Sequence, residues 1–299
     1  MKKLVYFVIL LFITVSCNKN SPHAVNIMSF NIWVGGGHHP LKNTADIILQ
    51  AQADIIGVQE STRDGKNSAV LIADSLGFSS YVNNNLTIIS KYPIVDTSVN
   101  KHGVKIQINK DKYVWMFNIH LIYCPYEPYQ LNGIEYCGAR LLSTAREAIE
   151  SAWKSRGEYV MSVVEDINNI RTENYPIFLT GDFNEPSYLD WTERATNAGL
   201  CIMPVEWPST KVFTDEAGMN DAYRKFYADE VSHPGHTWTS IPPASDQQEV
   251  MDRIDFVFYN GEILTLNEVK VVGEKSHSSD IQIDNYPSDH RAVIARFNY

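Results

Sequence analysis

Two polar side chains stand directly after a short apolar run in the middle of the chain. The run Ile177-Phe178-Leu179 predicts a buried strand, and Asp182 and Asn184 follow it within Thr180-Gly181-Asp182-Phe183-Asn184-Glu185-Pro186. A carboxylate and a carboxamide two residues apart at the end of a strand suit binding a hard cation or an attacking water molecule. Asp and Asn are also common in turns that cap a following helix, so this motif alone leaves both interpretations open.

Four other predicted strand ends carry polar residues that a strand does not need. Asn31 ends the first strand, Glu60 follows the second, His120 lies in an otherwise apolar strand, and Asp289-His290 precedes the last strand. Each has a structural alternative: in the same order, a turn, the start of a loop, a core histidine and an exposed loop tip. Open α/β sheets gather functional groups at the ends of their strands, so one convergent site accounts for all of them together.

The residue types of this set define its chemistry. Asn, Glu and Asp offer oxygen ligands, which suit Mg²⁺ or Mn²⁺ better than zinc. The two histidines can carry protons or stabilise an oxyanion near neutral pH. The sequence has no G-x-S-x-G motif and no G-x-x-x-x-G-K-S/T loop, which argues against serine acyl transfer and ATP use. Metal-assisted attack of water on a phosphoester remains.

Strands and helices must bring these positions together. The segments 104–108 and 114–119 indicate an antiparallel pair joined through a polar turn. Strand and helix patterns interleave without the strict alternation of a parallel sheet, so we predict an α/β (α+β) fold of two mixed sheets packed face to face with helices outside. Strands are predicted at 25–30, 55–58, 87–90, 104–108, 114–119, 177–179, 253–259, 269–272 and 292–297, and helices at 43–52, 139–170 with an interruption at Gly157, and 190–198 closing at Gly199.

Composition predicts a folded protein with one domain. The chain has 299 residues, of which 44% are hydrophobic, and this is ample for a core. No repeat, low-complexity tract or shift in composition appears after residue 25, so we assign residues 25–299 to a single domain. The formal net charge of −10 is a weak argument against a non-specific polyanion binder. It does not exclude a nuclease, because a metal site supplies local positive charge.

The N-terminus has the pattern of a leader. A basic start at residues 2–3 precedes an apolar run over 4–15 that is too short to span a membrane, and Cys17 follows a small residue. The pattern resembles a bacterial lipoprotein signal, which implies a signal peptide at 1–17, a lipid on Cys17 and a tether at 18–24. An ordinary cleaved signal peptide is the alternative. We expect a protein held at the cell envelope by its lipid anchor, at the outer membrane or the cell surface.

Three cysteines lie beyond the leader. In an exported protein Cys124 and Cys137 could form a disulfide that closes the loop between them, and buried unpaired thiols are the alternative. Cys201 completes the set. None has a zinc-like C-x-x-C spacing, so we expect no structural zinc.

The order of the motifs resembles the endonuclease/exonuclease/phosphatase superfamily, which includes deoxyribonuclease I-like nucleases, neutral sphingomyelinases and inositol-polyphosphate 5-phosphatases. Each motif alone is weak, but seven in the family's order are specific for the superfamily, though not for a substrate. The matching segments are Met28–Trp33, Asp54–Glu60, Ile89–Ile94, Asn118–Leu121, Gly181–Asn184, Arg253–Val257 and Ser288–His290.

The resemblance implies a four-layer α/β/β/α sandwich and a phosphoester hydrolase with Mg²⁺ or Mn²⁺ as its cofactor. On the metal side it implies Glu60 as the chief ligand, Asn31 beside it and Asp289 completing the set. The implied phosphoryl-side roles are water alignment or deprotonation by Asp182, a phosphoryl contact by Asn184, transition-state stabilisation by His290 oriented by Asp255, and a phosphate or leaving-group contact by His120. Asp255 is chosen over Asp252 because only Asp255 matches the family's R-I-D pattern.

Two loops are candidates for selecting the substrate. The segment 122–136 follows His120 and contains four tyrosines, including Tyr126, and Trp238 precedes the strand of Asp255. Aromatic rings beside a phosphate site could stack on a base or a sugar or contact a lipid, and ordinary loop packing is the alternative. We assign Tyr126 and Trp238 to substrate binding.

These observations predict a monomeric, metal-dependent phosphodiesterase. Its substrate is a nucleic acid, a phospholipid head group or a small organophosphate, and the sequence does not choose between them because its cations are scattered. A non-catalytic binding module on the same fold is the alternative, and the intact set of polar residues argues against it.

Overall fold

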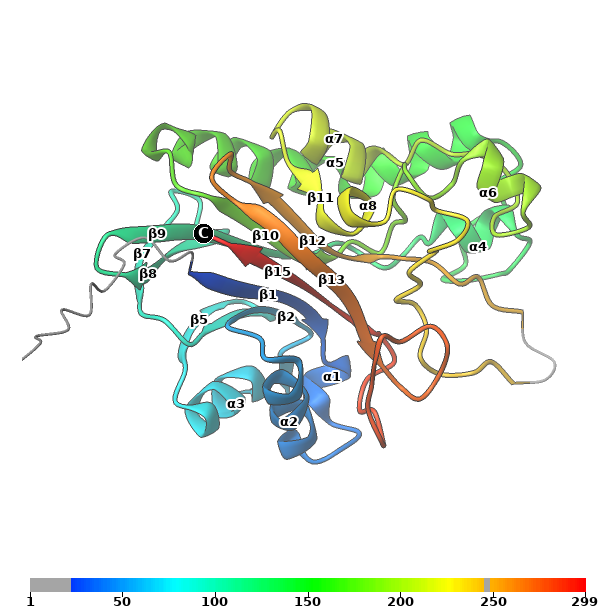
Figure 1. The fold of residues 1–299 in the computed structure, drawn as a ribbon. Coiled ribbons are helices and arrows are strands. Elements are labelled where there is room, and N and C mark those ends of the chain that lie inside the picture. Colours follow the sequence, from blue (N-terminus) through cyan, green and yellow to red (C-terminus); the bar gives the residue numbers. More distant parts are fainter. Residues whose placement is uncertain (1–22, 245–247) are drawn as a thin grey trace, which may run out of the picture.

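Two large β-sheets lie face to face in the computed structural model, which describes residues 23–244 and 248–299 (Figure 1). Over those residues the first sheet has seven strands, in the order β14 (Ile281–Gln282), β13 (Thr265–Gly273), β15 (Ala292–Asn298), β1 (Ala24–Asn31), β2 (Ile55–Gln59), β6 (Leu86–Ser90) and β5 (Ser79–Asn83). The second has six, in the order β11 (Asn220–Asp221), β12 (Asp255–Asn260), β10 (Ile177–Asp182), β9 (Lys112–His120), β8 (Gly103–Asn109) and β7 (Ile94–Thr97).

Helices cover the outer face of each sheet. Figure 1 shows α2 (Leu41–Ala51) and α3 (Ser68–Leu76) beneath the first sheet, and α5 (Ala145–Ile170) and α7 (Pro208–Asp215) above the second. This arrangement confirms the predicted α/β/β/α sandwich. The shorter elements are α1 (Trp33–Gly36), the hairpin of β3 (Thr62–Arg63) and β4 (Lys66–Asn67), α4 (Glu127–Leu131), the 3-10 turn Arg171–Glu173, α6 (Glu193–Asn197) and α8 (Ala222–Phe226).

Three apolar layers hold the sandwich together. The layer between the sheets contains Ile27, Val104 and Phe178, each fully buried. Ile47 and Ile56 belong to the layer under α2 and α3, and a third layer lies beneath α5. Since burying one such side chain contributes about 1.5–3 kcal/mol, these layers supply most of the driving force for folding.

A cluster of buried, hydrogen-bonded polar side chains crosses the interface between the two sheets. It lies near the strand ends that carry the predicted site. Gln59 donates to Asn118 Oδ1 over 2.6 Å, and Thr180 donates to the same oxygen over 3.2 Å. Ser29 Oγ accepts from the Gly181 N–H over 3.1 Å. Buried polar groups are costly unless paired, so these bonds fix the register of one sheet on the other.

The long helix differs from its predicted bounds. It starts at Ala145, because Thr144 accepts from the Glu147 N–H and caps it, and it runs unbroken through Gly157. A Cβ at Gly157 would lie 2.6 Å from the Trp153 indole, so glycine here makes room for that ring and the predicted interruption is wrong. The other two predicted helices appear as α2 and α6, and Gly199 follows α6 with a left-handed φ of +76°.

All nine predicted strands are present, with shifted ends. β10 continues through Asp182, whereas β12 begins at Asp255 rather than at residue 253. β1 begins at Ala24, and His23 exchanges two backbone hydrogen bonds with Tyr299, so the end of the predicted tether belongs to the sheet. The predicted signal peptide, Cys17 and residues 18–22 lie outside the described residues. Within the described residues, no helix is both long and apolar enough to span a bilayer.

Cys124 and Cys137 form the disulfide that was one of the two predicted possibilities. Their Cα atoms are 6.2 Å apart, and the bond closes a loop over a sequence separation of 13. Cys201 is a half-buried thiol. The disulfide therefore pins the tyrosine-rich segment that follows His120.

Candidate active site

Three of the predicted site residues lie in one row across the second sheet. The register pairs Asp182 on β10 with His120 on the parallel strand β9 and with Asp255 on the antiparallel strand β12. Directly paired residues project from the same face of a sheet. The strand ends therefore aim three ionisable side chains at one point.

His290 joins this row from the start of the last strand. Its Nδ1 lies 2.9 Å from Asp255 Oδ2, and its Nε2 lies 3.6 Å from Asp182 Oδ2. Burial alone would lower the pKa of His290, but the carboxylates of Asp255 and Asp182 outweigh it and raise the pKa to about 10. His290 is thus an imidazolium at neutral pH, and Asp255 orients it.

Asp182 carries a stable negative charge at the centre of the site. Burial would raise its pKa, but His290 and His120 reverse the effect and hold the pKa at about 2. His120 Nε2 lies 3.4 Å from Asp182 Oδ2, and this contact raises the pKa of His120 despite its burial. His120 therefore faces the site, and the alternative of a core histidine is wrong.

Asn184 is held beside Asp182 by the turn that follows β10. Its N–H donates to Asp182 Oδ1 over 2.9 Å, and its side-chain amide donates to the Leu121 carbonyl over 3.1 Å. Its φ of +44° is left-handed, a conformation that Asn tolerates better than most residues. The predicted turn and the predicted functional site are thus the same structure.

Glu60 and Asn31 lie on the opposite side of Asp182, at the ends of β2 and β1. Glu60 accepts from the Val34 N–H over 2.6 Å and from the Asn31 amide over 3.2 Å. The same Asn31 amide donates to Asp182 Oδ2 over 2.9 Å, while its oxygen accepts from the Trp33 N–H. Asn31 thus links the metal-side carboxylate to the phosphoryl-side carboxylate.

Backbone strain concentrates at this side of the site. Trp33, Val34 and Glu60 have φ values of +54°, +47° and +53°. A left-handed φ is a genuine outlier for a β-branched residue such as Val34, and it costs on the order of 1–3 kcal/mol. The strained turn positions the Val34 N–H to donate to Glu60. The strain is therefore located where the backbone orients this carboxylate.

Asp289 supplies the observation that tests whether a cation fits. Burial raises its pKa to about 6, opposed by His290 and reinforced by the Glu60 carboxylate. Its Oδ1 is buried, and no hydrogen-bond donor reaches it. A buried, unpaired carboxylate oxygen near a second carboxylate is a good fit for a divalent cation with oxygen ligands. Glu60 and Asp289, with Asn31 beside them, would hold it.

A second group of possible metal ligands lies next to this one. Single ligand atoms of Asp182, Asp255 and His290 all lie within 4.8 Å of one another. His290 already pairs with both aspartates, so this group is held together without a cation. The unpaired Asp289 Oδ1 makes the Glu60 and Asp289 side the better candidate for the cation.

The site opens into one cavity of about 400 Å³, here called the cleft. Both residues assigned to substrate binding line it: Trp238, whose ring centroid is 4.9 Å from that of His290, and Tyr126. Tyr126 is only 5% exposed, and its hydroxyl donates to Asp252 over 2.7 Å. Asp252 thus supports the cleft wall, away from the His290 and Asp255 pair.

Sequence reasoning missed the residues that hold these side chains in place. Thr237 Oγ1 accepts from the N–H groups of Ile254 and Asp255, each over 3.0 Å, where β12 begins. Ser288 Oγ donates to the Asn31 carbonyl over 2.7 Å and joins the end of β1 to the segment before β15. Thr237 is next to Trp238, and Ser288 lies in the Ser288–His290 segment. Their position at these motifs was the only sequence signal that could have identified them.

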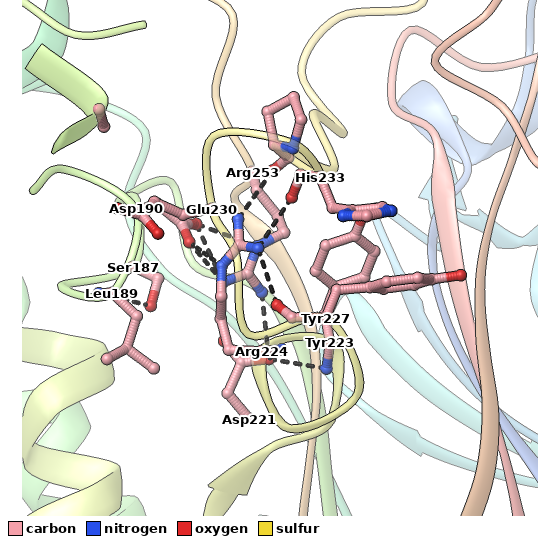
Figure 2. A network of polar contacts seen from close by, with 12 residues as sticks. Ser187, Leu189, Asp190, Asp221, Tyr223, Arg224, Tyr227, Glu230, His233 and Arg253 are labelled. Atoms are coloured by element: carbon pink, nitrogen blue, oxygen red, sulfur yellow. Dashed lines mark hydrogen bonds and ion pairs between the residues drawn. The ribbon is translucent and has the colours of Figure 1, made fainter. Parts of the chain in front are cut away.

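Two arginines anchor the segment before β12, and Figure 2 shows the network of polar contacts around them. Arg253 donates to Asp190 over 2.9 Å and to Asp221 over 2.7 Å, and Arg224 pairs with Asp190. Burial would lower the pKa of Arg253, but the two carboxylates raise it. The arginine of the R-I-D motif is therefore structural, whereas Ile254 lines the cleft and Asp255 contacts His290.

The match to a known family agrees with this geometry. The family model described as "Endonuclease/Exonuclease/phosphatase family" matches residues 28–290. The chain belongs to the endonuclease/exonuclease/phosphatase family. It is accordingly a phosphoester hydrolase, of a family whose enzymes use divalent metals.

Known proteins resemble this family member along its whole length. An uncharacterized protein of Caenorhabditis elegans, F14F9.5, is 26% identical over 325 residues, covering 99% of each chain. A solved family protein of Bacteroides thetaiotaomicron has a TM-score of 0.56 and 14% identity, covering 94% of this chain and 99% of its own. TDP2 of D. rerio, solved with a single strand DNA product, has a TM-score of 0.56 and 15% identity, covering 92% and 99%. At these identities the solved structures show the fold alone.

Proposed function

We propose that this protein is a divalent-metal-dependent phosphodiesterase in which Asp182 orients the water that attacks phosphorus. One observation carries the proposal. The buried Asp182 carboxylate is contacted by the imidazoles of His120 and His290 and by the Asn31 amide, within the cleft. Positive groups and an anchored carboxylate at one point suit a reaction that builds negative charge on a phosphoryl group.

Each side chain has a role that follows from its charge. The pKa of about 2 makes Asp182 a weak base, so its main task is to orient the attacking water by accepting a hydrogen bond. His290, held as an imidazolium by Asp255, donates to the phosphoryl oxygen that gains charge. Asn184 contacts the phosphoryl group, and His120 is placed to face the leaving oxygen.

Glu60, Asp289 and Asn31 are the residues that would hold the metal. When bound there, Mg²⁺ or Mn²⁺ would supply positive charge against the phosphoryl oxygens. The oxygen-only donor set and the unpaired Asp289 Oδ1 support this choice over zinc.

The charge balance of the cleft favours a diester over a monoester. Glu60, Asp182 and Asp289 bring three carboxylates to it, and no lysine or arginine lines it within the described part of the chain. A phosphodiester carries one negative charge and a monoester close to two at neutral pH. A lining without lysine or arginine therefore suits the singly charged diester better.

Hydrolysis of bis-p-nitrophenyl phosphate with and without Mg²⁺ tests the proposal. We expect turnover that needs the metal and that falls by orders of magnitude in His290→Ala with little change in melting temperature. A panel of plasmid DNA, RNA, sphingomyelin and inositol phosphates tests the natural substrate classes in the same assay. If the folded protein hydrolyses nothing in either set, the proposal fails and the binding-module alternative gains.

We further propose that a lipid on Cys17 anchors the protein at the cell envelope. The basic start, short apolar run and cysteine of the N-terminal sequence support this. Labelling with radioactive palmitate should mark the wild type and not Cys17→Ala. Equal labelling of both would refute the anchor.

A further inference from the structure

Three tyrosines of the cleft wall pack in sequence, each ring at about a right angle to the next. The ring centroids of Tyr126 and Tyr129 are 4.8 Å apart with planes at 86°, and those of Tyr129 and Tyr136 are 5.4 Å apart with planes at 87°. Successive right angles make corners, whereas a platform for stacked bases presents parallel faces. Trp238 lines the same cleft. We call these four residues the aromatic box.

The polar atoms of three members of the aromatic box are already engaged. Tyr129 Oη donates to Glu249 Oε1 over 2.6 Å, and the Trp238 indole N–H lies 3.2 Å from the same oxygen. Tyr126 Oη donates to Asp252 over 2.7 Å. These three residues therefore offer their rings rather than free hydrogen-bonding groups, and the Glu249 carboxylate binds the polar atoms of two of them.

The surrounding charges select a cation. Apart from the imidazoles facing Asp182, the described residues around the cleft contribute no positive group, while Glu60, Asp289 and Glu249 are acidic. A nucleic-acid strand would bring further phosphates along its backbone, which proteins neutralise with lysine and arginine. The negative faces of aromatic rings attract organic cations, and a wall whose polar atoms are mostly engaged suits a cation that cannot donate a hydrogen bond.

We propose that the aromatic box binds a quaternary ammonium group carried by the substrate, so that the enzyme acts on choline-type phosphodiesters. The inference rests on the proposed phosphodiesterase function and names its substrate class. The phosphate lies at Asp182 and His290, and the ammonium group lies against the rings. The single negative charge of the diester and the positive charge of the ammonium make the substrate zwitterionic, which matches a cleft with imidazolium at one end and acidic aromatic walls at the other.

The reaction balances without any further reactant. With p-nitrophenyl phosphocholine, the oxygen of water forms a bond to phosphorus and the bond from phosphorus to the nitrophenyl oxygen breaks. The products are phosphocholine and p-nitrophenolate, and the water protons leave to solvent.

A matched pair of substrates isolates the positive charge. p-Nitrophenyl phosphocholine and p-nitrophenyl 3,3-dimethylbutyl phosphate have the same shape, because carbon replaces nitrogen in the second. We expect kcat/KM to be roughly tenfold higher for the choline ester, which corresponds to a cation–aromatic interaction in a desolvated site. Equal rates, or faster hydrolysis of thymidine 5′-p-nitrophenyl phosphate, would overturn the inference. If no p-nitrophenyl diester is hydrolysed at all, the proposed function itself fails.

Variants locate the preference within the box. Tyr136→Leu removes a ring face, and Tyr136→Phe keeps it. Glu249→Gln keeps an oxygen acceptor for Tyr129 and Trp238 but removes the charge. Tyr136→Leu and Glu249→Gln should lower the preference mainly through KM for the choline ester, and Tyr136→Phe should retain it. Phe226→Leu changes an exposed ring outside the cleft, 41% accessible, and is the control. An unchanged preference in both folded variants would overturn the placement.

Competition tests the wild-type enzyme without any substitution. Choline should inhibit hydrolysis of the choline ester competitively and more strongly than 3,3-dimethylbutanol, and equal inhibition would contradict the inference. Glycerophosphocholine and vesicles of phosphatidylcholine with sphingomyelin then distinguish the source of the group. Hydrolysis of the first identifies a free diester and hydrolysis of the vesicles identifies a lipid head group. Hydrolysis of neither would overturn the assignment of substrate class.

Discussion

Asp182 Oδ2 lies 3.4 Å from His120 Nε2, across two parallel strands whose register places the two residues opposite each other. The contact joins the carboxylate of the G-D-F-N segment to a histidine from a distant part of the sequence. Because His290 approaches the same oxygen from the other side, Asp182 stays ionised in a buried position where an isolated carboxylate would take up a proton.

Asp182→Asn should remove most of the activity while changing the melting temperature little. The amide has the shape of the carboxylate but cannot hold water or imidazolium by charge, so we expect kcat to fall by about 10²–10⁴. Steady-state kinetics on bis-p-nitrophenyl phosphate and a thermal melt measure the two effects. Asp96→Asn, at an exposed position on β7, is the matched control. Full activity of Asp182→Asn would rule out the proposed role.

The stability of metal-free protein should depend on Asp182 at low pH. Its pKa is depressed from 3.8 to about 2, so its contribution is present above pH 3.8 and is lost as the pH falls through 2. Urea unfolding of wild type and Asp182→Asn between pH 2 and 5 measures the difference. We expect the wild type to lose more stability than the variant over this window. Parallel curves would contradict the depressed pKa.

Asp255→Asn should lower the pKa of His290. In the wild type that pKa is raised from 6.5 to about 10, so the imidazolium and its stabilising contribution persist below pH 6.5 and disappear as the pH rises through 10. Removing the carboxylate that lies 2.9 Å from Nδ1 should bring the titration toward 6.5. Nitrogen-detected NMR titration of metal-free protein measures it directly. The alkaline limb of the activity profile should move down in the same direction, and an unmoved His290 titration would sink the assignment.

Strand ends were predictable because their signals are local. An apolar run that stops at Glu60 or at Asp182 marks both a strand and its functional end, whatever the rest of the chain does. The start of α5 could also have been predicted, because Thr144 and Glu147 form a helix-capping pair. A prediction from apolar periodicity alone does not use this signal.

Side-chain packing and weak periodicity account for the errors and omissions. Gly157 continues a helix because a neighbouring tryptophan occupies the space beside it, which outweighs the low helix propensity of glycine. Glu249 accepts a hydrogen bond from Tyr129 over a sequence separation of 120, and the sequence around either residue does not predict this contact. The segment that became α3 is apolar on most of its circumference, so no strong helical periodicity distinguished it.

Glu60→Gln should weaken metal binding, by at least about tenfold, because a charged ligand becomes neutral. Titration of metal-free protein with Mn²⁺, followed by electron paramagnetic resonance, gives the affinity without relying on activity. Glu165→Gln, an exposed position on α5, is the control. Chelation with EDTA should abolish wild-type turnover, and added Mg²⁺ should restore it. Unchanged Mn²⁺ affinity in Glu60→Gln would move the cation to another set of ligands.

Gly57→Ala should damage the polar group that joins the two sheets beneath the site. A Cβ at this position would collide with Thr180 Oγ1 and lie 2.6 Å from Asn118 Oδ1, both part of that buried group. Overpacking of this kind costs about 1–3 kcal/mol, and the strand ends bearing Glu60 and Asp182 would be pushed apart. We therefore expect Gly57→Ala to lower both the free energy of unfolding in urea and kcat.

Gly65→Ala is the control. Gly65 lies in an open hairpin turn where an added Cβ would have no atom within 4 Å, and its φ of +73° adds only a local backbone cost. Equal destabilisation by the two substitutions, with full activity of Gly57→Ala, would show that the sheet interface does not position the site.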